Sequence, residues 1–175
     1  MDILIKDHKK DLAQAKKDVP QGKFLVAGLP KLPFPNQRFD MVTLYDVLEH
    51  IPVHLVEPSL AEIYRVLKPG GRLIISVPNR RVVVMALDPA WYFGHRHYSV
   101  GQLKKLLQAP NYKIIKIAFG GGWWEIIALL IFYFDKKLFH RDLIFKKFFI
   151  QKTTGDYLSN PKSFATLYAV GEKIR

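Results

Sequence analysis

The sequence contains no cysteine among its 175 residues. This absence excludes disulfides, thiolate zinc sites and a cysteine nucleophile, and it fits a reducing compartment. No apolar run reaches the roughly 18–20 residues that a membrane-spanning helix needs. The first residues also lack the charged-then-apolar layout of a secretion signal. We therefore expect a cytoplasmic protein whose contact with a membrane, if it has one, is peripheral.

Acidic residues are scarce: 15 Asp and Glu face 27 Lys and Arg, which gives a net charge of +12. Such an excess is typical of proteins that bind nucleic acid, an anionic membrane surface or an acidic substrate, and also of ordinary basic surfaces. We find no recognised nucleic-acid-binding module, so nucleic acid is the least favoured partner. Since 49% of the residues are hydrophobic, residues 1–175 can form one domain with its own core.

The central part of the chain predicts a parallel crossover unit. Met41–Leu44 and Leu73–Val77 are short apolar runs with the β-branched content of buried strands. Between them, Pro58 begins a segment whose apolar residues from Leu60 to Leu67 follow helical spacing, and Pro69–Gly71 ends it. Strand, helix, turn and strand in this order indicate an α/β fold, with ligands beyond the carboxyl ends of the strands.

Other segments extend this pattern in both directions. Ser99 and Gln102 form a predicted capping box at the start of a further helix. Four more strands are predicted, the last of them in an edge region: Ile3–Lys6, Lys23–Ala27, Tyr112–Phe119 and Ser163–Val170.

Four motifs occur in a fixed order along the first half of the chain. They are Leu32-Pro33-Phe34, Phe39-Asp40, Val47-Leu48-Glu49-His50 and Leu67-Lys68-Pro69-Gly70-Gly71. At these spacings the string closely resembles the second half of the class I, Rossmann-like S-adenosylmethionine-dependent methyltransferases, type 11. The resemblance runs from about Ile3 to Phe119. It implies a Rossmann-like sheet with helices on both faces, and methyl transfer from S-adenosylmethionine to an acceptor that the motifs do not define.

The family's first strand and its glycine-rich turn have no counterpart here, since G-x-G-x-G occurs nowhere in the sequence. In the family this strand is the centre of the sheet. We therefore expect a gap between the strand that ends near Asp7 and the strand that ends near Tyr45. The chain is truncated, is a degenerate relative, or receives the strand from a second chain; we favour truncation.

The resemblance implies which residues bind the cofactor. An acidic residue after the family's second strand holds the ribose hydroxyls, because a carboxylate accepts two hydrogen bonds from a diol. Asp7 is our candidate and Asp2 the second choice, while an N-cap or loop role for Asp7 is the alternative. Gly28 stands where the family has an acid that contacts adenine. Gly28 and Leu29 would therefore contact the cofactor through their backbone.

The strand Met41–Leu44 leads to Tyr45 and Asp46, which we expect at the rim where cofactor and substrate meet. Methyl transfer to oxygen or nitrogen requires the removal of a proton, and a histidine near its ordinary pKa suits this task. His50 and His97 are the candidate general bases.

Asp46, Glu49 and His50 share one face if this segment is helical, and with His95 or His97 they could bind a divalent metal. The set resembles that of some small-RNA 2′-O-methyltransferases and some quinone-precursor O-methyltransferases. However, the Leu-Glu-His triplet is common in relatives that hold no metal. We therefore predict no metal site.

The loop that follows Pro78 covers the active site in relatives and contributes substrate contacts. Its aromatic rings offer flat apolar surfaces, and its arginines offer contacts to anions. Ordinary packing of a lid is the alternative interpretation. The predicted substrate-binding residues are Arg80, Trp91, Tyr92, His95 and Tyr98.

Residues 120–157 form a predicted helical insert before the last strand. Trp123–Phe134 is almost wholly apolar, and Asp135–Lys152 alternates basic with aromatic and aliphatic residues. This composition favours binding at a membrane interface, and it would also suit a cap over an apolar substrate or a homodimer contact.

Two functions follow from these observations. The first is an S-adenosylmethionine-dependent methyltransferase that acts on a small molecule, an apolar or lipid-linked one being favoured by the insert. The second is a non-catalytic, methyltransferase-like scaffold that uses the insert to bind a partner or a membrane.

Overall fold

The computed structural model describes residues 2–4, 13, 16–138, 146–159 and 163–174. The strands and helices, in chain order, are β1 (Asp2–Leu4), β2 (Lys23–Leu25), β3 (Phe39–Tyr45), η1 (Leu48–His50), α2 (Val53–Val66), β4 (Leu67–Pro78), α3 (Val82–Leu87), η2 (Pro89–Phe93), α4 (Val100–Gln108), β5 (Tyr112–Gly120), α5 (Trp123–Leu138), α6 (Lys146–Ser159) and β6 (Thr166–Lys173).

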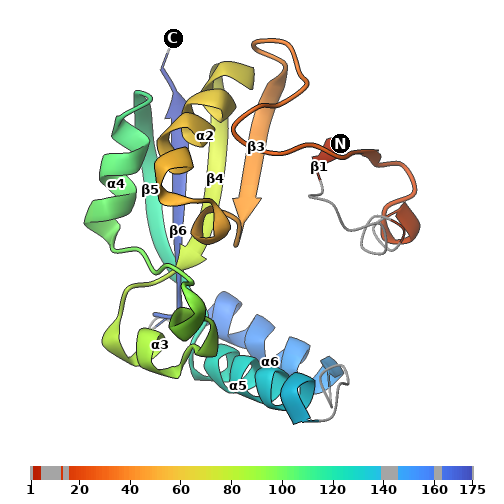
Figure 1. Cartoon of the computed structure of the whole chain (residues 1–175), viewed down its shortest axis with the longest axis vertical. Helices are drawn as coiled ribbons and strands as arrows, with labels where there is room; N and C mark the ends of the chain where they lie inside the picture. The colour runs from red at the N-terminus through yellow and green to blue at the C-terminus, as the bar shows by residue number, and fades with distance from the viewer. Residues whose placement is uncertain (1, 5–12, 14–15, 139–145, 160–162, 175) are drawn as a thin grey trace.

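A four-stranded sheet with the order β3-β4-β6-β5 forms the centre of the fold (Figure 1). β3 and β4 are parallel, and β6 is antiparallel to both of its neighbours. Helices α2 and α4 cover one face of this sheet, where Leu73, Ile75 and Val77 of β4 are fully buried. The α/β fold and the crossover unit are confirmed.

We predicted from the sequence that the last strand lies in an edge region of the sheet. The structure shows that this prediction was wrong. β6 pairs with β4 on one side and with β5 on the other, so it is an interior strand. The burial of Leu167 and Ala169 against the core accounts for this position. A buried interior strand and a short edge strand can both appear in the sequence as a single apolar run. The sequence pattern therefore does not distinguish the two positions.

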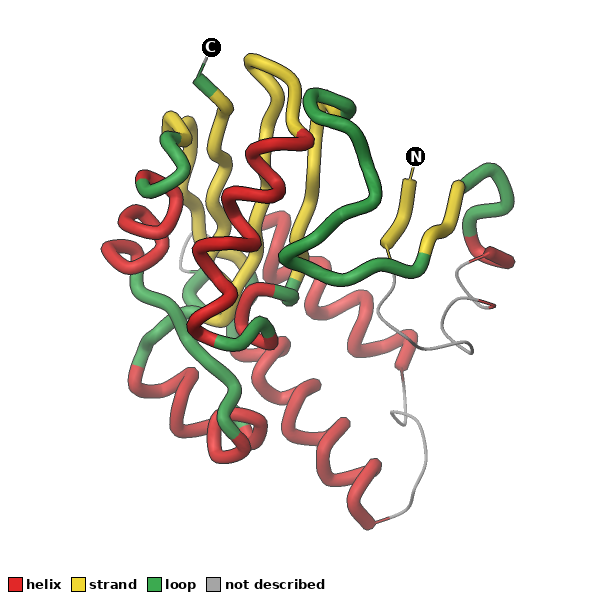
Figure 2. Tube along the Cα trace, turned by 45° about the horizontal axis from the view of Figure 1, so that its top comes forward, coloured by secondary structure: helices red, strands yellow, loops and turns green. Residues whose placement is uncertain are grey.

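The predicted gap in the sheet is present among the described strands. β1 and β2 pair with each other in parallel and form a separate sheet. Figures 1 and 2 show this pair on the β3 side of the main sheet and apart from it. Among the described strands, β3 therefore has β4 as its single neighbour, and its other edge is unpaired.

Helix α2 begins five residues earlier than predicted, because Pro58 lies inside the helix and does not start it. Pro52 stands at the N-cap, and Val53 begins the helix. Val56, Leu60 and Ile63 then form a single buried stripe against the sheet. Pro58, in the second turn, lacks the N–H for one backbone hydrogen bond of the helix. The burial of the apolar stripe that includes Val56 outweighs the loss of this hydrogen bond.

Helices α5 and α6 pack together beyond the carboxyl ends of β3 and β4 (Figure 1). A small buried cluster formed by Val84, Ile126, Phe164 and Ala165 connects this pair to α3 and to the start of β6. Within the described residues, no helix is long and apolar enough to cross a membrane.

Candidate functional site

A sharp turn ends β3 at the rim where we expected cofactor and substrate to meet. Asp46 has a φ of 52°, a left-handed conformation that is uncommon for a residue other than glycine. Its N–H donates to the carbonyl of Ser76 at 3.2 Å and to Ser76 Oγ at 3.1 Å. The Ser76 hydroxyl in turn donates to Asp46 Oδ1 at 2.9 Å. β4 thus holds this turn, and it leaves Tyr45 55% exposed.

The short helix η1 follows this turn and buries both Leu48 and Glu49. The Glu49 carboxylate is 3% exposed, and neither oxygen accepts a hydrogen bond from a described residue. Burial therefore raises the pKa of Glu49 to about 7, despite the nearby charge of Arg96. Arg96 donates through Nη2 to the carbonyls of Leu48 and Ile51, and it does not bond Glu49.

Residues 79–98, which we call the lid segment, leave the end of β4 and return to it. The Arg80 N–H donates to the carbonyl of Tyr98, and the Tyr98 N–H donates to the carbonyl of Pro78, both at 2.9 Å. Asn79 Nδ2 donates to the carbonyl of Phe164 at 2.8 Å, so the start of the segment is also tied to the residues before β6. The lid segment is therefore anchored at both of its ends.

Asp88 connects two histidines of the lid segment. Its Oδ2 lies 2.9 Å from His97 Nε2 and 3.4 Å from His95 Nδ1, and its Oδ1 accepts the N–H of Ala90 at 2.9 Å. Burial would raise the pKa of Asp88, but these hydrogen bonds, with that of His97 the strongest, lower it. On its far side, His95 Nε2 lies 3.2 Å from His50 Nε2. Sequence reasoning missed Asp88, whose one local signal is its position before Pro89, typical of a helix start.

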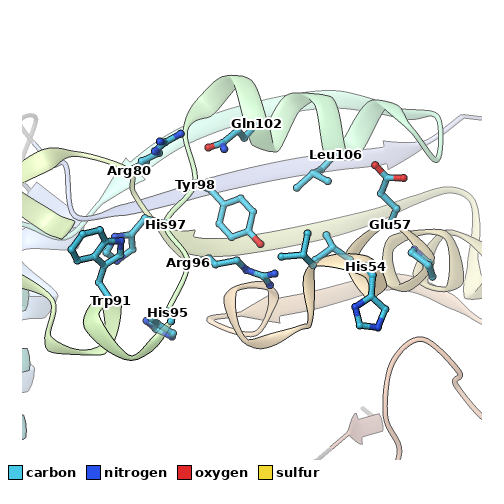
Figure 3. Close-up of a pocket in the computed structure, with 14 residues that line it drawn as sticks. His54, Glu57, Arg80, Trp91, His95, Arg96, His97, Tyr98, Gln102 and Leu106 are labelled. Atoms are coloured by element: carbon cyan, nitrogen blue, oxygen red, sulfur yellow. The ribbon is translucent and has the colours of Figure 1, made fainter.

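A groove of about 900 Å³ lies between α2, α4 and the lid segment (Figure 3). Tyr98 and His97 are nearly buried in its wall, and Trp91 is 39% exposed. Tyr92 does not line the groove; it is 67% exposed, and its hydroxyl donates to the carbonyl of Ala86 at 3.4 Å. The groove brings together five residues that the sequence singled out: Arg80, Trp91, His95, His97 and Tyr98.

The residues predicted to bind the cofactor do not line this groove. Asp7 lies outside the described residues. Gly28 is exposed and faces open space, and Leu29 packs against the main core. Tyr45 and Asp46 stand at the end of β3, on the side of the gap between the two sheets.

Comparison with known proteins finds similarity to methyltransferases. Residues 3–75 match the family model described as "Methyltransferase domain". Over these residues, which make up less than half of the chain, the sequence is similar to the class I methyltransferases.

Two relatives and one solved structure illustrate the relationship. A probable S-adenosylmethionine-dependent methyltransferase of Mycolicibacterium smegmatis is 27% identical over 67% of this chain and 46% of its own length. A ubiquinone/menaquinone biosynthesis C-methyltransferase of Stutzerimonas stutzeri is 41% identical over 38% of this chain and 26% of its own. The chain thus spans less than half the length of these two relatives.

The solved structure is the 1,6-didemethyltoxoflavin-N1-methyltransferase of Burkholderia thailandensis with bound 1,6-didemethyltoxoflavin and S-adenosylhomocysteine. It superimposes with a TM-score of 0.62 at 15% identity, over 99% of this chain and 61% of its own. At this identity the superposition establishes the methyltransferase fold alone.

The methyltransferases that this chain resembles use S-adenosylmethionine as their cofactor. A side chain at Gly28 would meet nothing within 4 Å, so a planar ring has room beside this backbone. The left-handed turn at Asp46 leaves Tyr45 exposed at the end of β3. The sequence has no glycine-rich turn to hold the methionine end.

Proposed function

We propose that this chain carries the acceptor groove and part of the cofactor rim of an S-adenosylmethionine-dependent methyltransferase. The observation that carries the proposal is the placement of the lid segment. Its hydrogen bonds to the end of β4 and to the Leu48 carbonyl hold an aromatic and histidine-lined groove beside η1, the short helix that follows the Asp46 turn. When bound, the cofactor would supply an electrophilic methyl group. The chain's own residues would position the acceptor and remove its proton.

His97 is the better placed of the two predicted general bases. Its Nε2 is the atom that faces Asp88 at 2.9 Å, and a carboxylate at this position favours the Nε2–H tautomer. Nδ1 is then the basic nitrogen, and it is buried without a hydrogen-bond partner among the described residues. Because His97 Nδ1 is closed off from solvent, the groove wall would have to open for a hydroxyl or amine to donate its proton to this nitrogen, and Asp88 would then stabilise the imidazolium.

Gly28 and Leu29 would offer their backbone to the adenine, and Asp7 would hold the ribose. The test is calorimetric titration of the 175-residue chain with S-adenosylmethionine and S-adenosylhomocysteine. We expect micromolar binding, its loss in Asp7→Ala, and its retention in Asp2→Ala. If only Asp2→Ala loses binding, Asp2 and not Asp7 is the residue that holds the ribose. If the wild-type chain produces neither heat nor a thermal shift, the enzymatic proposal for this chain is wrong.

We also propose that the acceptor is apolar or lipid-linked and is met at an anionic membrane surface. The α5–α6 pair carries exposed apolar side chains, among them Trp123 and Phe134, which are more than half exposed, and Ile150 on α6. Lys152 Nζ lies 5.5 Å from the ring centroid of Trp124, so cationic and aromatic groups mix on one surface. This mixture matches headgroups that combine negative charge with an apolar boundary.

Sedimentation with vesicles tests this surface. We expect the chain to bind vesicles that contain phosphatidylglycerol and not neutral phosphatidylcholine vesicles, with binding reduced at least threefold in Trp123→Ser and Ile150→Ser. Val53→Ser is the matched control, because Val53 is an apolar residue on α2 that is even more exposed than Trp123 and Ile150. If light scattering instead shows a dimer that the α5–α6 variants dissociate, the pair is a homodimer contact and the membrane proposal fails.

The scaffold hypothesis keeps one specific observation in its favour. β1–β2 forms its own sheet, and the described strands leave the edge of β3 unpaired. A chain that binds the anionic vesicles and binds neither S-adenosylmethionine nor S-adenosylhomocysteine would fit the scaffold and refute the enzyme.

A further inference from the structure

Glu49, His50 and His95 come together from two segments that are 45 residues apart in the chain. A ligand atom from each of the three lies within 4.8 Å of the other two. The two imidazole rings have centroids 4.5 Å apart, and their Nε2 atoms face each other at 3.2 Å. The three side chains therefore converge on one point beyond the end of β3.

Arg96 acts on the Glu49 carboxylate through its charge, but neither carboxylate oxygen has a hydrogen-bond partner among the described residues. A carboxylate buried without hydrogen-bond donors is costly, and its retention calls for a cation or a proton. Arg96 is the nearest candidate, but its Nη2 donates to two backbone carbonyls, those of Leu48 and Ile51. Arg96 Nε has no partner, and it does not reach either Glu49 oxygen. A bound cation would complete this environment.

Asp88 orients one of the two imidazoles toward the same point. Its Oδ2 faces His95 Nδ1 at 3.4 Å, which favours a proton on Nδ1 and leaves the lone pair of Nε2 directed at His50 and Glu49. A histidine that binds a metal commonly donates its other N–H to a carboxylate in this way. Asp88, His95 and His97 also lie close enough to hold an ion. However, Asp88 already accepts hydrogen bonds from both rings, so it is better suited to orient a ligand than to be one.

The spacing and chemistry of these ligands indicate the kind of ion. Two nitrogen ligands about 2.0–2.1 Å from a tetrahedral ion are themselves about 3.3 Å apart, close to the 3.2 Å between His50 and His95. Two imidazoles and one carboxylate suit zinc and neighbouring transition metals, whereas magnesium and calcium prefer oxygen. Three protein ligands leave a fourth position open.

We propose that Glu49, His50 and His95 bind one divalent transition-metal ion, zinc foremost, and that Asp88 is a positioning residue for His95. The site differs from the set that the sequence brought forward, because the Asp46 carboxylate is taken up by Ser76 and is no member of it. It also reverses our sequence-based expectation of no metal. The inference does not depend on methyl transfer, since it concerns the binding of the ion itself.

The test is metal titration of the tag-free chain after treatment with EDTA, followed by calorimetry and elemental analysis. We expect one equivalent of Zn²⁺ bound with a micromolar or lower Kd, and no competition from Mg²⁺. Co²⁺ should give the intense visible absorption of a four-coordinate site. We expect His50→Ala and His95→Ala to weaken binding at least 100-fold, and Asp88→Asn to weaken it about 10–100-fold.

His54→Ala is the matched control, because His54 is exposed on α2 and belongs to neither histidine cluster. Glu49→Gln keeps the shape of the side chain and removes its charge, and circular dichroism melts establish that each variant folds. Loss of Zn²⁺ in folded Glu49→Gln supports the site. The proposal is overturned if the wild-type chain binds no Zn²⁺, or if folded His50→Ala and His95→Ala bind it as tightly as His54→Ala does.

Discussion

Glu62 and Arg65 on α2 form an ion pair that holds the loop between β2 and β3, and Glu62→Gln should reveal its strength. Arg65 donates to both Glu62 oxygens at 2.8 Å, and Glu62 Oε1 accepts the N–H of Leu32 at 2.8 Å. Arg65 also donates to the carbonyl of Phe34 at 2.9 Å and to Asn36 Oδ1 at 2.6 Å. One pair therefore fixes the loop that carries the Leu-Pro-Phe motif.

The hydrogen bonds from Arg65 lower the pKa of Glu62 from 4.5 to about 2. That difference corresponds to at most about 3.4 kcal/mol of folding free energy. The Arg65 side chain is 33% exposed, so solvent screens the pair, and we expect about 1–2 kcal/mol. Because the folded-state pKa is the lower one, this stabilisation is complete above pH 4.5 and is lost as the pH falls through 2.

Urea unfolding followed by circular dichroism at pH 7, 5, 4 and 3 measures this contribution. Glu62→Gln should lose about 1–2 kcal/mol at pH 7, and the difference from the wild-type chain should narrow below pH 4.5. Glu57→Gln, an exposed change on the same helix, should stay within about 0.5 kcal/mol of wild type. A Glu62→Gln deficit that is absent at pH 7, or that does not narrow by pH 3, would refute the reasoning.

Three further substitutions test the packing around the site. Leu48→Ala should reduce the free energy of unfolding by about 2–5 kcal/mol in urea titrations, because Leu48 is fully buried; a loss below about 1 kcal/mol would contradict its place in the core. Ser99→Ala should cost about 1 kcal/mol by thermal melting, since it removes the capping box with Gln102, and an unchanged Tm would count against that cap. Gly71→Ala should cost about 1–3 kcal/mol, because its Cβ would lie 2.8 Å from the carbonyl oxygen of Lys68. Equal stability of Gly71→Ala and wild type would show that this turn relaxes freely.

The elements with local signals were predictable from the sequence. Met41–Leu44 and Leu73–Val77 are strands as their composition predicts, and the Ser99–Gln102 capping box is a short-range hydrogen-bond pattern. The predicted burial holds for Leu73–Val77 but not for Met41 and Thr43, which are exposed on β3. The gap beside β3 followed from a missing motif, because the methyltransferases that the sequence resembles place the strand with that motif at the centre of the sheet.

The parts that depend on distant contacts were not predictable. Asp88 is an ordinary helix-start residue in the sequence, and its two histidine partners appear only when the lid segment folds back. Our predicted start of α2 at Pro58 was wrong. Val56 lies before Pro58 in the sequence and belongs to the same buried stripe of the helix. The metal ligand set that we propose from the structure leaves out Asp46, which the sequence had included. Its carboxylate accepts a hydrogen bond from Ser76, a residue 30 positions away in the chain.

The interior position of β6 imposes an order on biosynthesis. β5 reaches the rest of the sheet through β6, which leaves the ribosome after the other described strands. Until residues 166–173 emerge, β4 has an open edge and β5 has no partner strand, while the apolar α5–α6 hairpin is already synthesised. Contacts between segments this far apart form slowly, and exposed edges and apolar helices favour aggregation meanwhile. The nascent chain should therefore depend on a chaperone, or on an early docking surface for α5–α6, until its final strand closes the sheet.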